Sequence, residues 1–318
     1  MRKHLFLLVF LVITLFVIGC GPNISEKVRD LENPSADVRE KALKDLVEIG
    51  DPAVAPVIEI IGSKNATTRT IASDVLIEIG EPCIAPLLKV IDDSKSDSLK
   101  AGQAVYIIGE LGEKYQSKVE DILIKHVTDP RYAVRVNTIA ALGKIKSEKS
   151  IKDLNGILEK EFESENPEWN VITILAKSIG MIGQNGANEI LFKYLNSKKT
   201  PLHIKKDIAT YIEGVSTNAM REDLIKYVTN LGGKKHSGWG TLDGMKLMSV
   251  LTKTLGSMPK SKDLINILLD IQKYYGFDDT FYPKVIYSLD KIGPKDKEIQ
   301  SIIDKLEVKR EKLEKKGK

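Results

Sequence analysis

Histidine is a common metal ligand, and this chain has four: His126, His203, His236 and, near the N-terminus, His4. Zinc and iron sites need several nitrogen, sulfur or oxygen ligands at set spacings. None of these histidines has a second ligand at such a spacing, and each lies in a different part of the chain. The sequence therefore predicts surface or helix-capping histidines and no metal site.

Acid–base or nucleophilic catalysis has no clear set of residues here either. Carboxylates occur close together, for instance Glu110 with Glu113, but they are interspersed with lysines as on a solvated helix face. No serine stands in a nucleophile-elbow motif and no glycine-rich phosphate loop follows a strand. We expect no catalytic residue, no cofactor and no small-molecule substrate.

The chain has two cysteines, Cys20 and Cys83. Cys83 takes the place that Ala53 has thirty residues earlier, in an otherwise similar stretch. This correspondence predicts a small buried residue, while an intermolecular disulfide or a reactive thiol are the alternatives.

The N-terminus has the layout of an export signal: basic Arg2 and Lys3, uncharged Leu5 to Ile18, then Gly19 before Cys20. Fourteen helical residues extend about 21 Å, less than the ~30 Å hydrocarbon core of a membrane. A cleaved signal is therefore favoured over a permanent transmembrane helix.

Val17-Ile18-Gly19-Cys20 resembles the lipobox of bacterial lipoproteins. The resemblance implies that residues 1–19 are removed, that Cys20 is the site of lipid attachment, and that residues 20–25 form a lipidated tether. Two or more acyl chains anchor a protein stably. The resemblance also implies that the protein is in the bacterial cell envelope. In a cell with two membranes, Gly21 after the cysteine favours attachment to the outer membrane, facing the periplasm. The alternative is an ordinary secretory signal with an incidental cysteine.

Composition favours a folded helical protein without affinity for nucleic acid. Hydrophobic residues make up 42%, charged residues 29% and aromatic residues only 6%. Without Arg2 and Lys3, 46 basic residues face 44 acidic ones. Nucleic-acid binders usually concentrate positive charge, so nucleic acid is not expected as a partner.

A thirty-residue repeat dominates the first part of the mature chain. Arg39, Ala42, Leu46 and Gly50 align with Arg69, Ala72, Leu76 and Gly80. Apolar residues recur at helical intervals on both sides of each glycine, which predicts two amphipathic helices per unit. Gly50 is predicted to close the first helix in the left-handed conformation. Weaker copies predict further turns at Gly112, Lys146, Gly183 and Gly293, and about eight helix pairs in all.

This period and the residues Asp37-Val38-Arg39, Ala42 and Leu46 to Gly50 resemble HEAT repeats, and they look closest to the type named after phycobilisome lyases. The resemblance implies a right-handed α-solenoid, an all-α fold, over residues 26–305. Residues 306–318 are predicted to be a charged C-terminal helical tail. In this family the groove is lined mainly by the second helix of each pair and binds proteins or peptides.

Two further features are candidates for function or for structure. The irregular stretch from Gly232 to Gly240 contains Lys234, Lys235, His236 and Trp239, which is the composition of a contact loop; a flexible spacer is the alternative. The repeated Arg39, Arg69 and Arg135 are predicted to form a ladder with carboxylates of adjacent units, with a binding row as the alternative.

The leading hypothesis is an envelope lipoprotein that is not an enzyme and that binds a protein partner or acts as a scaffold through its solenoid groove. One alternative is an enzyme or accessory subunit, because phycobilin lyases belong to the same repeat class. The other is a structural spacer between the membrane and the C-terminal end.

Overall fold

The computed structural model describes residues 23–183, 187–212, 224–229, 242–258, 260–274 and 281–316. Within these ranges the chain consists of helices and short turns, and no β-strand occurs. None of the described helices combines the length and the hydrophobicity needed to cross a bilayer. The chain divides into two compact units, Met1–Ala141 and Leu142–Lys318, and the boundary falls inside one helix.

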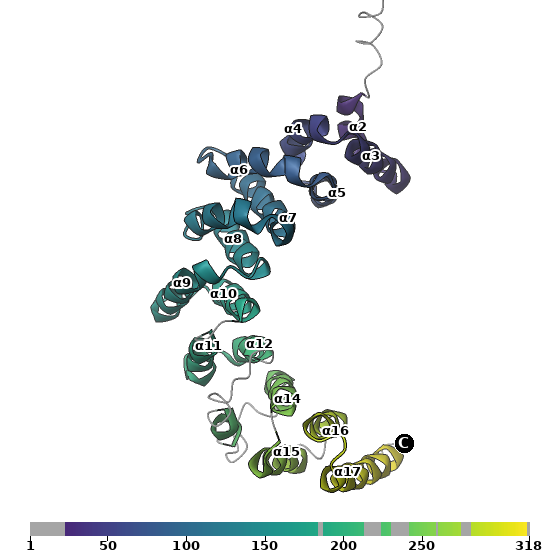
Figure 1. Ribbon diagram of the computed structural model, residues 1–318, viewed down its shortest axis with the longest axis vertical. Coiled ribbons are helices and arrows are strands. Elements are labelled where there is room, and N and C mark those ends of the chain that lie inside the picture. Colours follow the sequence, from purple (N-terminus) through teal and green to yellow (C-terminus); the bar gives the residue numbers. More distant parts are fainter. Residues whose placement is uncertain are drawn as a thin grey trace, which may run out of the picture. The chain divides into compact units, whose positions relative to one another are not determined.

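Unit 1 begins with a short helix, α2, followed by helix pairs (Figure 1). Its N-cap, Asn23, accepts a hydrogen bond from the backbone N–H of Glu26, so Ile24 and Ser25 are helical although they were expected in the tether. The helices of this unit are α2 (Ile24–Asp30), α3 (Ala36–Ile49), α4 (Asp51–Ile60), α5 (Ala66–Ile79), η1 (Glu81–Cys83) with α6 (Ile84–Asp92), α7 (Ser98–Lys125) and most of α8 (Tyr132–Lys144).

Unit 2 continues the same pattern. It contains the end of α8, η2 (Glu148–Ser150) with α9 (Ile151–Glu163), α10 (Trp169–Ile182), α11 (Ala187–Asn196), α12 (Leu202–Ile212), a helical segment at 224–229, α14 (Leu242–Gly256), α15 (Lys262–Tyr274), α16 (Phe281–Ile292) and α17 (Lys297–Lys316). Together with unit 1 the described residues form eight successive pairs, as the sequence predicts. The charged end of the chain is the continuation of α17 through Lys316.

The glycine turns of the first two pairs exist, with a different backbone geometry from the one expected. Gly50 has φ 72° and ψ −133°, and Gly80 has φ 84° and ψ −130°. The positive φ agrees with the prediction, but ψ lies outside the left-handed helical region. Gly50 donates to the carbonyl of Leu46 and accepts from the N–H of Ala53, so one residue ends a helix and begins the next. This backbone region is accessible essentially only to glycine.

The third turn is not at Gly112, where the sequence placed it. Gly112 is buried inside α7, and the backbone leaves helical geometry at Tyr115, with φ −124° and ψ 32°. Pro52 and Pro82 follow the earlier turn glycines by two residues, whereas Lys114 stands at the corresponding place after Gly112. A glycine without a following proline can remain helical, so the break moves along the chain.

The fourth turn has a lysine where the turns at Gly50, Gly80 and Gly183 have a glycine with positive φ. Lys146 has φ 53°, and among the described residues it is the only non-glycine with positive φ. The N–H groups of Lys146 and Ser147 donate to the carbonyls of Gly143 and Leu142, which is the hydrogen-bond pattern of a Schellman cap. The geometry of the cap is therefore kept at a site where the side chain opposes it.

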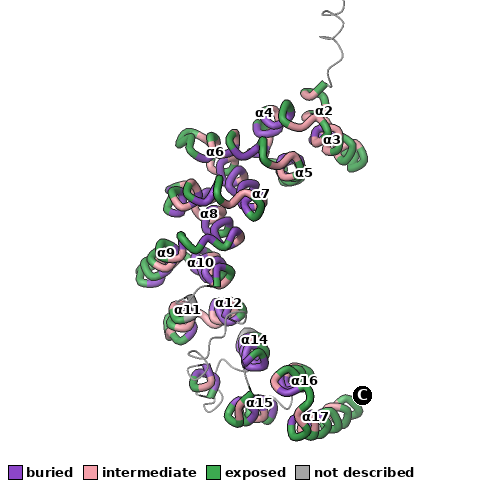
Figure 2. The backbone as a smooth tube through the Cα atoms, viewed as in Figure 1, coloured by how far each residue is buried: buried purple, intermediate pink, exposed green. Residues whose placement is uncertain are grey.

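Each unit has its core between the first and second helices of its pairs, as the buried residues in Figure 2 show. The repeated Leu46 and Leu76 are both fully buried, and so is Cys83. The predicted burial of Cys83 is confirmed, and its thiol is free. Burial raises its pKa to about 12, which keeps the thiol protonated and poorly nucleophilic.

Candidate interaction face

Two of the sequence-based site predictions lie outside the described residues. These are the lipid-attachment residue Cys20 and the candidate loop residues Lys234, Lys235, His236 and Trp239. Among the residues that the structure does describe, no group of three or more histidine, cysteine, aspartate or glutamate side chains is arranged to hold a metal ion.

His126 is a capping residue, as expected, but its side chain is largely buried rather than on the surface. It is the C-cap of α7, its Nδ1 lies 3.0 Å from Asp129 Oδ2, and its Nε2 lies 3.1 Å from Asp92 Oδ1. The two carboxylates contact opposite ring nitrogens, so they cannot share one metal ion with this imidazole. Sequence reasoning missed this cluster because Asp92 is thirty-four residues away.

Arg131 also belongs to the cluster and joins the loop after α6 to the loop after α7 through hydrogen bonds. Its Nε and Nη2 donate to the two Asp129 oxygens at 2.9 and 2.8 Å, and Nη2 also donates to the carbonyl of Ile91 at 2.7 Å. These hydrogen bonds hold the pKa of the buried Asp129 carboxyl well below its usual range. Every charged group in the cluster has a protein partner, which is typical of a structural site.

The repeated arginines have a structural role, and all three share a backbone partner that the sequence did not suggest. Arg39, Arg69 and Arg135 each donate from Nη1 to the backbone carbonyl six residues earlier, at 2.7, 2.6 and 3.2 Å. The acceptor belongs to the loop that leads into the arginine's own helix. The position is repeated because each such loop leaves a partly buried carbonyl for which the arginine supplies a donor.

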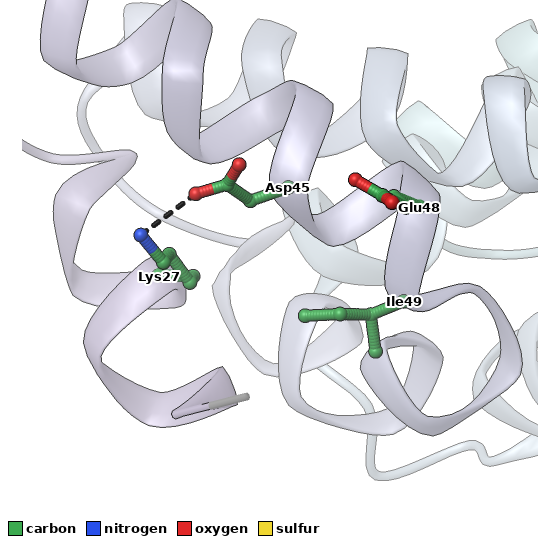
Figure 3. Close-up of a pocket in the computed structure, with 4 residues that line it drawn as sticks. All are labelled: Lys27, Asp45, Glu48 and Ile49. Atoms are coloured by element: carbon green, nitrogen blue, oxygen red, sulfur yellow. Dashed lines mark ion pairs between the residues drawn. The ribbon is translucent and has the colours of Figure 1, made fainter. Parts of the chain in front are cut away.

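A pocket at the start of unit 1 is lined by Lys27, Asp45, Glu48 and Ile49 (Figure 3). Lys27 Nζ lies 2.7 Å from Asp45 Oδ2, and this contact lowers the pKa of Asp45. The ion pair joins α2 to α3 and neutralises the lysine. We therefore interpret this pocket as a packing feature between two helices rather than as an anion site.

The first helices of successive pairs approach each other closely. An added Cβ on five of their glycines would lie between 2.6 and 2.9 Å from an atom of the next first helix. The pairs are Gly102 with Ala133, Gly109 with Ala141, Gly143 with Ser178, Gly180 with Tyr211, and Gly256 with Ser288. Ordinary carbon contacts are about 3.5–4 Å, so only glycine permits this spacing.

The second helices of neighbouring pairs contact each other much less, as for α4 with α6 and α9 with α11. In a stack of pairs, the row with the closer spacing lies on the inner side of the local curve. Within each unit the first helices therefore form the inner face. The resemblance to HEAT repeats implied instead that the second helices line the groove. The signal in the sequence for the inner position of the first helices is the row of glycines, which the sequence analysis did not use.

The exposed side of the first helices α5 and α7 in unit 1 differs in charge from that of the first helices in unit 2. In unit 1 it contains the carboxylates of Asp74 and Glu78 on α5 and of Glu110 and Glu113 on α7. Partial burial and the charge of Glu78 raise the pKa of Asp74. Tyr106 of α7, 43% exposed, lies on the same helix face because it is four residues before Glu110. This surface has negative charges around an exposed aromatic ring.

In unit 2 the corresponding surface is basic. We call it the basic face, and define it by six lysines on the solvent side of the four first helices: Lys177 of α10, Lys206 of α12, Lys246 and Lys253 of α14, and Lys284 and Lys291 of α16. Two of the aspartates whose side chains the structure describes, Asp207 and Asp290, share it. An extended surface with one dominant charge is suited to holding a partner of opposite charge.

Comparisons with known proteins support the repeat class and the fold. A family model described as HEAT repeats matches residues 84–166, which contain α6 to α9. No curated protein sequence matches the chain.

Solved structures with similar folds were also found. Kap121p bound to Pho4p is 16% identical with a TM-score of 0.59, over 85% of this chain and 33% of that one. This chain thus spans about a third of the length of Kap121p. Human deoxyhypusine hydroxylase in complex with glycerol is 14% identical with a TM-score of 0.35, over 86% of this chain and 95% of that one.

The complex of CpcE and CpcF of phycocyanin lyase from Nostoc sp. is 14% identical with a TM-score of 0.36, over 93% of this chain and 96% of that one. The similarities to deoxyhypusine hydroxylase and to the CpcE–CpcF complex are too low to support an argument. The similarity to Kap121p and the matched family model agree with the paired helices of the structure. The part of the chain that the structure describes is therefore an all-helical solenoid, and residues 84–166 match HEAT repeats.

Proposed function

We propose that this protein is a lipid-anchored scaffold of the bacterial envelope, which binds a protein partner along the exposed side of its first helices and does not act as an enzyme. The observation that carries the proposal is the closely packed row of first helices. Within each unit this row presents one exposed side of successive helices, on which Tyr106 of unit 1 is 43% exposed and Tyr287 of unit 2 is 48% exposed. Exposed aromatic side chains are enriched where proteins bind each other.

The fold gives this proposal further support. Kap121p was solved bound to Pho4p, so a solenoid of this kind can hold another protein. The one buried charged cluster discussed above is fully engaged in holding loops, and it contains no nucleophile. The lipobox-like sequence before Cys20 supports the membrane anchor.

Site-specific photocrosslinking in living cells tests the binding surface. A photoreactive phenylalanine analogue is placed at Tyr106 or Tyr287 and, as controls, at Lys160 of α9 or Val308 of α17, which are exposed on second helices. We expect discrete crosslinked protein products from the two tyrosine positions and not from the controls. Equal products from all four positions, or none from the tyrosines, would contradict the proposal.

The anchor is tested separately. Replacing Cys20 with serine removes the thiol that the lipid would be joined to, so we expect the protein to move from the membrane fraction to the soluble fraction. A high-salt wash distinguishes lipid attachment from electrostatic adhesion, because salt screens only the latter. If the Cys20→Ser variant stays in the membrane after that wash, lipid attachment at Cys20 is not the anchor.

A further inference from the structure

The basic face has at least one lysine from each of the four first helices of unit 2. Lys246 and Lys253 are seven residues apart on α14, as are Lys284 and Lys291 on α16, so each pair lies on one side of its helix. Lys177, Lys246 and Lys291 are exposed. The positive charge thus runs across the helices, from one first helix to the next, as well as along them.

Each first helix of unit 2 packs directly against the next first helix. This packing sets the length of a ligand that would cover the basic face. α10 contacts α12, α12 contacts α14, and α14 contacts α16. Packed helices lie about 10 Å apart, so four of them span about 30 Å. An extended peptide covers about 3.3 Å per residue, so about nine residues would cross the face.

Apolar groups lie between the lysines. Tyr287 is 48% exposed, and Lys291 Nζ lies 5.4 Å from the centre of its ring. Met181 of α10 is 38% exposed. A protein segment with carboxylates and one or two apolar side chains matches this combination, because each of its groups finds a counterpart on the face.

Two other polyanions fit the face less well. Nucleic-acid sites favour arginine, whose planar guanidinium binds phosphate through two hydrogen bonds, and every cation of the basic face is a lysine. Asp207 and Asp290 would also repel a phosphate backbone. A flat anionic bilayer cannot follow the inner side of a curved row of helices, whereas an extended peptide can.

We propose that the basic face binds an acidic segment of the partner protein, about nine residues long and containing an apolar side chain. This inference rests on the proposed function, because it names the chemistry of the partner for the same surface. Lys206 and Asp207 of this face form an ion pair with each other at 2.8 Å. Among the described side chains, six lysines against two aspartates still leave an excess of positive charge that a carboxylate-rich segment neutralises.

The test is a binding titration with the purified full-length chain. The probe is a fluorescein-labelled peptide of about twelve residues, made of aspartate and glutamate with one tyrosine, followed by fluorescence anisotropy. The test variant is Lys246→Glu with Lys291→Glu on the basic face. The matched control is Lys160→Glu with Lys273→Glu, which changes the charge equally on the exposed sides of α9 and α15. Far-UV circular dichroism shows that each variant is folded.

We expect the wild type to bind the acidic peptide and not a serine–glycine peptide of equal length. The test variant should lose roughly tenfold or more in affinity, while the control variant stays within about twofold. Binding should weaken as ionic strength rises. Absence of binding, or equal loss in both variants, would overturn the inference. Tighter binding of phosphatidylglycerol vesicles or of single-stranded DNA, with the same sensitivity to the test variant, would also overturn it.

The crosslinking experiment separates this inference from the proposed function. If crosslinks from Tyr287 persist in the Lys246→Glu, Lys291→Glu variant and the peptide does not bind, the partner is held without an acidic segment. The inference is then wrong and the scaffold function stands. If no crosslinks form from the tyrosine positions of the wild type, the scaffold function itself is wrong.

Discussion

The close packing of the first helices can be tested with one pair of glycine substitutions in unit 2. Gly143 of α8 and Gly156 of α9 both lie within helices. An added Cβ on Gly143 would lie 2.6 Å from both Cα and Cβ of Ser178 in α10, whereas nothing lies within 4 Å of one on Gly156. Alanine is favoured over glycine inside a helix by about 0.8–1 kcal/mol at both positions.

The expected effects have opposite signs. Gly156→Ala gains only the helix propensity and should stabilise the protein by about 0.8 kcal/mol. Gly143→Ala has the same gain, but α8 and α10 must separate by about 1 Å to reach a normal carbon contact. Overpacking of this kind costs about 1–3 kcal/mol. The difference between the two variants in free energy of unfolding is this steric cost, because the propensity cancels.

The assay is urea unfolding, followed by the fluorescence of Trp169 at the start of α10, in a Trp239→Phe background that leaves a single tryptophan. Trp169 is a local probe because its ring packs edge-on against Phe162 of α9, with centroids 6.1 Å apart. A local probe is needed since repeat arrays do not always unfold as one unit. If Gly143→Ala stabilises the protein as much as Gly156→Ala does, the first helices are not as close as the structure has them and the inner face is misassigned.

Three further predictions concern the turns and the buried polar groups. Lys146→Gly should raise the free energy of unfolding by about 1 kcal/mol in the same urea assay, because φ is 53° at this residue and glycine accepts positive φ without strain; a loss of stability would contradict this account of the turn. Cys83 should resist alkylation by iodoacetamide at pH 8 in the folded protein and react after denaturation, because burial raises its pKa to about 12; mass spectrometry showing rapid labelling of folded protein would disprove it. Asp129→Ala should lower the free energy of unfolding by about 3 kcal/mol, since it leaves the Arg131 charge without its buried partner. The pKa of Asp129 is lowered in the folded state, so its contribution is present above the unfolded-state pKa near 4 and lost as pH falls below it; a gap between wild type and variant that stays constant down to pH 2 would refute this linkage.

The elements of this fold are largely predictable from the sequence because they depend on local patterns. The helical spacing of apolar residues around Gly50 and Gly80 predicts the paired helices, and the alignment of Cys83 with Ala53 predicts its burial. The positive φ of the turn glycines follows from the same pattern. The prediction of a turn at Gly112 is wrong, because the sequence there lacks the proline that stops helix extension after Gly50 and Gly80.

The contacts that define the surfaces could not be predicted in this way, because their partners are far apart in the chain. Asp92 and His126 meet only when α6 and the end of α7 pack together. The shared acceptor of the repeated arginines is a backbone carbonyl, and a main-chain group leaves no trace in residue identities.

The sequence by itself thus determines the paired helices, the turns at Gly50 and Gly80, and which side of each helix is apolar, since these depend on residues within one or two turns. Only the tertiary structure decides which of the two helix rows is the inner one. That choice depends on how closely neighbouring helices approach, and Gly143 against Ser178 shows that a contact between residues thirty-five positions apart controls it. The lysines of the basic face become one surface only because this packing brings their four helices side by side.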